Sequence, residues 1–133
     1  MVKVKEAKKG DLAGLDGKRN ALGGPSFSHS ALEMLMLAPD FSVLVAGGSA
    51  VVVYHEGKGG KSRILLLVGE ASSDLLGGAE GSSRQAGAVK LTLEAAPDSP
   101  ALPELESEGY RRAGNVANYF GKDRPALFLE KNL

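Results

Sequence analysis

Residues 41–68 read FSVLVAGGSAVVVYHEGKGGKSRILLLV, and this stretch decides the fold. Two apolar runs, 41–46 and 50–55, are rich in β-branched residues and are joined by two glycines and a serine, which is the pattern of a β-hairpin. After a glycine-rich turn comes a third run, Arg63 to Val68. Because positions 64–68 are apolar without alternation, this run predicts a central strand that is covered on both faces.

Upstream of this stretch, the sequence predicts one short strand and two helices. Valines and lysines alternate over residues 2–5, as in a strand with one wet face. Asp11 can cap a short helix, which a cluster of glycines then ends. A second helix is expected to begin at Ser28 or Ser30, because apolar residues recur at helical spacing after it, and Pro39 should end it.

Downstream, a glycine- and serine-rich segment of uncertain structure, 69–87, leads to a further strand at 89–94. A helical stretch, 101–108, follows two prolines, and two last strands are predicted at 110–119 and 126–131. This order of elements predicts an α+β fold. We expect the 133 residues to form a single domain, because a chain of this length buries one core.

Composition excludes several classes of function. Sixteen basic residues balance sixteen acidic ones, so no overall charge attracts nucleic acid or an anionic membrane. The absence of cysteine removes disulfides, thiolate nucleophiles and cysteine-ligated metals. No window approaches the length of a membrane span, and a cytoplasmic location is expected. The histidines, His29 and His55, lack a second ligand at metal spacing, so we expect surface residues and no metal site.

The last third of the chain carries the segments AVKLTLE (88–94), Gly109-Tyr110, Asn118-Tyr119-Phe120 and ALFLEK (126–131). In order and spacing these segments resemble the last strands of the GNAT superfamily of acetyl-CoA-dependent N-acetyltransferases. Nearer the start, PSFS (25–28) before the second helix looks like the ribosomal-protein alanine N-acetyltransferase branch. The resemblance implies a mixed, mostly antiparallel sheet of six to seven strands with helices on both faces.

The same resemblance implies transfer of an acetyl group from acetyl-CoA to a primary amine, on a protein N-terminus or a small molecule. Glu94 matches the general base at the end of the fifth strand, although a solvated strand end is its plain structural alternative. Tyr119 matches a substrate-side aromatic, and a packed loop residue is equally compatible. The position of the branch's general acid is occupied by Leu105, so that role is vacant.

The segment that should hold the cofactor diphosphate departs from the family pattern, Arg/Gln-x-x-Gly-x-Gly/Ala, whose amides cradle phosphate at a helix start. Read without a gap, DLLGGA (74–79) keeps the Gly-x-Ala half but places Asp74 where a cation or amide is expected, and a carboxylate repels a diphosphate. A second register keeps a longer helix and deletes the loop, and the sequence leaves both open. The cofactor-binding residues that the resemblance implies are Leu67, Val68, Gly69, Gly77, Gly78, Ala79 and Ser99.

Two functions therefore remain open, an N-acetyltransferase and a catalytically inactive GNAT-fold binding or partner protein. Asp74, Leu105 and the shortened middle segment favour the second, whereas Glu94 and the retained Gly-x-Ala favour the first. The partner that the resemblance implies is an amine-bearing acceptor. No nucleic acid or membrane partner is expected, and the choice between monomer and homodimer stays open.

Overall fold

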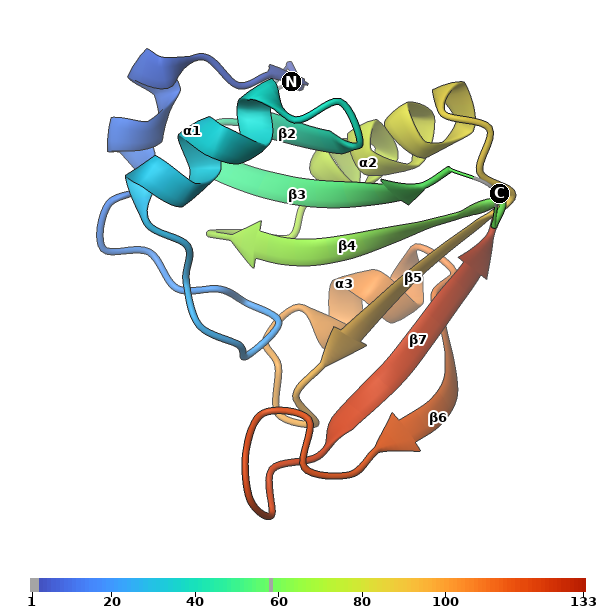
Figure 1. Cartoon of the computed structure of the whole chain (residues 1–133). Helices are drawn as coiled ribbons and strands as arrows, with labels where there is room; N and C mark the ends of the chain where they lie inside the picture. Colours follow the sequence, from blue (N-terminus) through green and yellow to red (C-terminus); the bar gives the residue numbers. More distant parts are fainter. Residues whose placement is uncertain (1–2, 58) are drawn as a thin grey trace.

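The computed structural model describes residues 3–57 and 59–133 (Figure 1). Their strands form one seven-stranded sheet in the order β1-β2-β3-β4-β5-β7-β6. All neighbouring strands pair antiparallel except β4 and β5, which are parallel. The predicted α+β fold with a mixed, mostly antiparallel sheet is confirmed. The strands are β1 (Lys5–Glu6), β2 (Phe41–Ala46), β3 (Ser49–Glu56), β4 (Lys61–Val68), β5 (Lys90–Ala95), β6 (Arg111–Val116) and β7 (Ala126–Asn132).

Helices cover both faces of the sheet, as expected. α1 (His29–Leu37) lies on one face over β2 to β4, and α2 (Ser73–Gln85) and α3 (Leu102–Ser107) lie on the other (Figure 1). The Ser28 hydroxyl caps α1 by accepting from the Ala31 amide at 3.1 Å, which confirms one of the two predicted starts. Among the described residues, no helix has the length and apolar character needed to span a membrane.

The central position of β4 is confirmed by burial on its two faces. Leu66 packs into a cluster with Leu12 and Leu32 beneath α1, whereas Leu67 packs into a larger cluster with Leu93 and residues of α2 and α3. Both β4 leucines are fully buried. Because successive strand side chains point to opposite faces, one apolar run serves two cores.

The N-terminal elements differ from expectation in detail. Part of the expected strand at 2–5 lies outside the described residues, and β1 is only Lys5–Glu6. The helix after it is a 3-10 helix, η1 (Lys9–Leu15). The Lys8 amide donates to the Asp11 carboxylate at 2.8 Å, and this bond lowers the pKa of Asp11. Near the other end, β6 is shorter than predicted because residues 117–125 form a loop.

The family resemblance predicts parallel strands at 63–68 and 88–94 that diverge near Val68. β4 and β5 do run parallel and diverge, but nearer their N-terminal ends. They pair from Lys61–Lys90 to Ile64–Leu93 and then diverge, so the predicted divergence near Val68 was wrong in position. A β-bulge lies at the point of separation: Val52 and Val53 of β3 pair with Leu66 and Ile64, which leaves Leu65 as the extra residue.

Candidate functional site

A pocket of about 340 Å³ opens beside the diverging ends of β4 and β5. It is formed by β4, β5, the loop after η1 and the loop between β6 and β7. Its polar side chains include Arg63, Glu94 and Tyr119, and its apolar wall includes Leu22, Phe27 and Leu65. We refer to this cavity as the Glu94 pocket.

Arg63 links the two residues that the family resemblance singled out. Its Nε and Nη2 atoms each donate to Oε2 of Glu94 at 2.9 Å. Nη2 also donates to the Tyr119 hydroxyl at 2.5 Å. The Glu94 side chain is 13% exposed, and the Tyr119 ring packs edge-on against Phe120 at 4.8 Å. Glu94 and Tyr119 thus share one site, although Glu94 lies in β5 and Tyr119 lies in the loop between β6 and β7.

The sequence interpretation did not connect Arg63 with Glu94. It placed Arg63 at the start of the third strand and grouped it with nearby lysines, as a cluster that could meet the 3′-phosphate of CoA or form a solvated hairpin face. A signal existed: Arg63 pairs with Thr92, two residues before Glu94 on the next strand. Side chains two positions apart lie on the same face of a sheet, so a charged residue entering an apolar central strand can reach that carboxylate.

The Arg63–Glu94 pair leaves groups available to a ligand. Both printed contacts end on Oε2 of Glu94, and within the described part of the chain its Oε1 accepts no hydrogen bond. Nη1 of Arg63 likewise has no partner among those residues. The pocket can therefore accept one more donor at the carboxylate and offer one donor from the guanidinium.

The split itself is filled by the segment that we call the strap, Asn20–Leu22. Figure 1 shows the loop between η1 and α1 reaching the diverging ends of β4 and β5. The Ala21 amide donates to the Leu67 carbonyl at 2.6 Å, and the Ala96 amide donates to the Leu22 carbonyl at 2.7 Å. The strap residues are buried, with exposures of 8%, 8% and 2%.

The family resemblance implies that backbone amides of residues 67–69 polarise the thioester of the cofactor, but two of these amides have partners inside the chain. The Leu67 amide donates to Oδ1 of Asn20 at 3.2 Å, and the Gly69 amide donates to the Arg19 carbonyl at 3.4 Å. Val68 pairs with Ala50 of β3. The expectation that the Leu67 and Gly69 amides are available to a cofactor is therefore wrong for this conformation.

Ser99 also serves the strap. It is 6% exposed, its hydroxyl donates to the Ala21 carbonyl, and the same oxygen accepts from the Ala101 amide at 3.2 Å. The expected cofactor contact of this hydroxyl is replaced by a contact within the chain.

Gly77, Gly78 and Ala79 lie inside α2 rather than in a loop before it, so the ungapped register was wrong. Only residues 69–72 join β4 to α2. Ala79 is fully buried, and a Cβ on Gly78 would come 2.6 Å from Cγ1 of Val4. Gly78 and Ala79 pack the helix against the sheet, Gly77 lies on its open side, and none of the three is in a loop that could present amides to phosphate.

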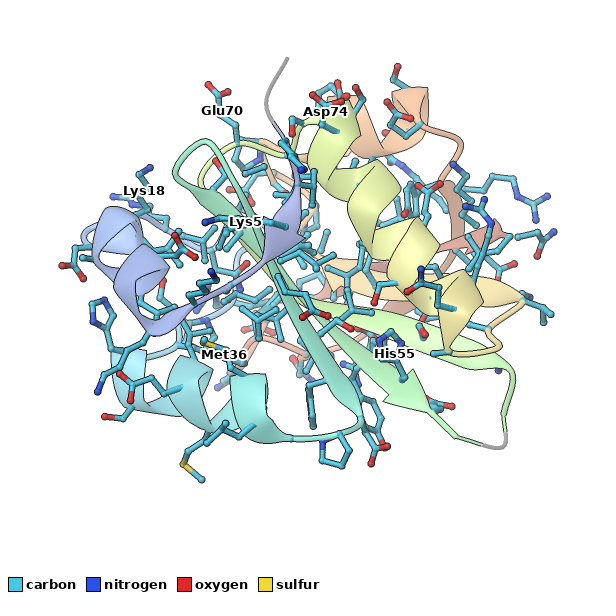
Figure 2. The ribbon with its side chains drawn as sticks, turned by 90° about the horizontal axis from the view of Figure 1, so that it is seen from above. Lys5, Lys18, Met36, His55, Glu70 and Asp74 are labelled. Atoms are coloured by element: carbon cyan, nitrogen blue, oxygen red, sulfur yellow. The ribbon has the colours of Figure 1, made fainter. Side chains whose placement is uncertain are left out.

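Two carboxylates stand at the start of α2. Glu70 lies in the short loop and Asp74 in the first helical turn, and Figure 2 shows both projecting on the same side of the molecule. The Leu75 amide is taken by the Ser72 hydroxyl at 3.1 Å. The cations on the facing loop are Lys18, which donates to the Gly48 carbonyl, and the exposed Arg19.

The residues present do not fit acetyl-CoA. The strap fills the split between β4 and β5, and two carboxylates, Glu70 and Asp74, stand at the start of α2, where the family resemblance implies a phosphate site. The carboxylates would repel a diphosphate, because like charges repel. The Leu67 amide already donates to Asn20, so it cannot also donate to a thioester oxygen.

His55 lies outside this site and is not the surface residue that we expected. It is half-buried, and its two ring nitrogens lie 2.8 Å from the Ser42 hydroxyl and 2.7 Å from the Ser62 hydroxyl. Figure 2 shows it beneath α2, and burial lowers its pKa. Within the described residues, no three His, Asp or Glu side chains gather as metal ligands.

Comparison with known proteins identifies the fold. No family model and no curated protein matches the chain. Among solved structures, it is similar to the ribosomal-protein-alanine N-acetyltransferase from Brucella melitensis, with a TM-score of 0.74, 18% identity, and coverage of 98% of this chain and 99% of the other.

Two further structures agree. An acetyltransferase of the GNAT family from Streptococcus pneumoniae gives a TM-score of 0.70 at 14% identity, with 100% of both chains covered. The spermidine N-acetyltransferase from Vibrio cholerae, solved with CoA and spermine, gives 0.73 at 16%, with 98% of this chain and 95% of the other covered. At such identities the likeness establishes a shared fold.

Proposed function

We propose that this chain is a GNAT-fold binding protein that takes an amine-bearing partner in the Glu94 pocket and does not use acetyl-CoA. The observation that supports the proposal is the contrast between the Glu94 pocket and the neighbouring split between β4 and β5. The pocket beside Glu94 is open and carries a carboxylate oxygen that has no partner among the described residues, whereas the adjoining split is filled by the strap.

The polar groups of the pocket favour an amine that lies next to a carbonyl. An ammonium would contact Oε1 of Glu94, and a carbonyl beside it would accept from Nη1 of Arg63. A bare amine would face the Arg63 charge without compensation. A protein N-terminus carries both groups, so we favour it over a simple amine. The apolar wall suits a small first side chain.

Calorimetric titration of a short peptide tests this proposal. A tripeptide amide with a free N-terminus should bind, and its N-acetylated twin should bind at least tenfold more weakly, because acetylation removes the charge that Glu94 attracts. Glu94→Gln should cause a similar loss. Glu130→Gln is the matched control, since Glu130 pairs with Lys90 at 3.2 Å and does not line the pocket.

The proposal fails if the free and acetylated peptides bind wild-type protein equally, or if neither binds. It also fails if Glu94→Gln and Glu130→Gln behave alike. Circular dichroism of each variant would establish that the fold is retained.

The second candidate is an amine N-acetyltransferase of the ribosomal-protein alanine branch. The position of Glu94 at the mouth of a pocket, in a fold shared with such enzymes, favours it. Mass spectrometry of the same tripeptide after incubation with the protein and acetyl-CoA decides between the two candidates. Formation of an acetylated peptide at a rate lowered by Glu94→Gln would support the enzyme and overturn the binding protein.

A further inference from the structure

We infer that the strap, Asn20–Leu22, is a permanent structural element that replaces the arm of a cofactor in the β4–β5 split, and is not a lid that opens. This inference concerns the split alone and holds whether or not the Glu94 pocket binds an amine.

The strap completes the sheet where β4 and β5 separate. On the β4 side, Asn20 and Val68 form an antiparallel bridge, and the Ala21 amide bonds to the Leu67 carbonyl. On the β5 side, the Leu22 carbonyl accepts from the Ala96 amide. A short piece of backbone thus satisfies polar groups of both strands, as an inserted strand would.

Asn20 fixes the strap from within. Its Oδ1 atom accepts from the Leu67 amide at 3.2 Å and from the Leu22 amide at 3.1 Å, while Nδ2 lies 3.5 Å from the Pro25 carbonyl. The residue is 8% exposed. A buried side chain amide that serves two backbone donors holds both the strap and the strand in one geometry.

The strap also belongs to the hydrophobic core. Ala21 and Leu22 pack in the same cluster as Leu67 and Ala95, and the Ser99 hydroxyl bonds the strap from the α3 side. Segments that open readily have few buried contacts. This one has a buried leucine and polar bonds on two sides.

The bend after the strap is built for close packing. Gly23 has φ of +105°, and a Cβ there would lie 2.6 Å from Cβ of Ala96. A glycine is therefore needed both for the backbone angle and for the contact with the end of β5.

Opening the split would break contacts that the closed form keeps. It would strip the Leu67 amide and carbonyl and the Ala96 amide of their partners and expose Leu22. Glu70 and Asp74 would then oppose an entering diphosphate.

Hydrogen exchange and thermal unfolding test the inference. In the wild-type protein, the amides of Leu67 and Ala96 should exchange as slowly as that of Val52 in central β3, because all three open only in global unfolding. Asn20→Ala should lower the Tm by roughly 4 °C or more. Arg19→Ala, a neighbour with an exposed side chain, should leave the Tm unchanged. Millimolar CoA should not raise the Tm of either variant or the wild type.

The opposite results would identify a lid. Exchange at Leu67 about a hundredfold faster than at Val52 would overturn the inference, and so would a CoA-dependent rise in the Tm of the wild type or of Asn20→Ala. If Asn20→Ala does not fold, the exchange rates and the CoA titration of the wild type decide the question without it. An amine-binding failure at the Glu94 pocket would leave this result unaffected.

Discussion

Replacing Tyr110 by phenylalanine should make stability less sensitive to alkaline pH. Tyr110 is 2% exposed, and its hydroxyl donates to Oε2 of Glu80 at 3.1 Å. Burial, and next the charge of Glu80, raise the pKa of Tyr110 far above its ordinary value. The folded protein therefore keeps this proton at pH values where the unfolded chain loses it, so the stability contribution is complete below about pH 10 and falls above it.

The magnitude follows from the pKa of tyrosine in the unfolded chain. Between pH 8 and pH 11, ionisation of that tyrosine stabilises the unfolded state by roughly 1.4 kcal/mol. The free energy of unfolding of Tyr110→Phe does not fall in this way, because phenylalanine does not ionise. The variant lacks the hydrogen bond to Glu80, however, and this costs about 1.5 to 3 kcal/mol at pH 8. The stability gap between the two proteins should therefore shrink by about 1.4 kcal/mol as the pH rises to 11.

Urea unfolding followed by circular dichroism at pH 8, 9, 10 and 11 measures this gap. The other titrating groups are common to both proteins and cancel in the difference. Leu105→Ala is a suitable control, because it removes a fully buried side chain near Tyr110 without changing a titrating group, so its gap to the wild type should stay constant. A constant gap for Tyr110→Phe as well would refute the assignment of a raised pKa.

Four further substitutions test the fold and the proposed absence of a phosphate site. Leu66→Asp should cost several kcal/mol in chemical denaturation, because it buries an unpaired charge in β4, and a variant that unfolds like the parent would contradict the central strand. Asp74→Arg should lose up to about 1 kcal/mol by opposing the helix dipole at the start of α2. It should gain no CoA affinity, and salt-sensitive CoA binding by this variant would revive the phosphate cradle. Gly77→Ala should stabilise α2 by about 1 kcal/mol because its site is open. Gly78→Ala should not, since its Cβ would meet Val4, and equal gains in thermal unfolding would contradict that packing.

The regular elements could be predicted from local patterns. In the stretch 41–68, apolar runs separated by glycine turns predicted three strands, and Ser28 predicted the start of α1. Burial of one face and capping of a helix end depend on neighbours in sequence, so these rules work without knowledge of the fold.

The register of segment 69–87 could not be settled in this way. Gly77, Gly78 and Gly81 each disfavour a helix by up to about 1 kcal/mol. Burial of Leu75 and Leu76 against the sheet outweighs that local cost, and such tertiary packing is invisible to propensity.

The strap could not be predicted from sequence patterns, for a different reason. Residues 19–23 (RNALG) show neither helical nor strand periodicity, and Asn20 bonds to a backbone amide 47 positions away. A backbone amide has no side-chain signature, so nothing in the sequence marks Leu67 as the partner of Asn20.

The short β4–α2 loop and the strap both bear on the hydrogen bonding of backbone groups at the β4–β5 split. A split between parallel strands exposes backbone groups that must find partners, and a bound cofactor arm can supply them. Here four residues, 69–72, separate β4 from α2, and Glu70 and Asp74 project on the same side of the molecule at the start of α2, where their charges would oppose an anion. In the folded chain the Leu67 residue is fully buried, so leaving its amide without an acceptor there would cost about 1 to 3 kcal/mol. The strap supplies acceptors to both strands through Asn20 and Leu22, so the chain itself closes the split.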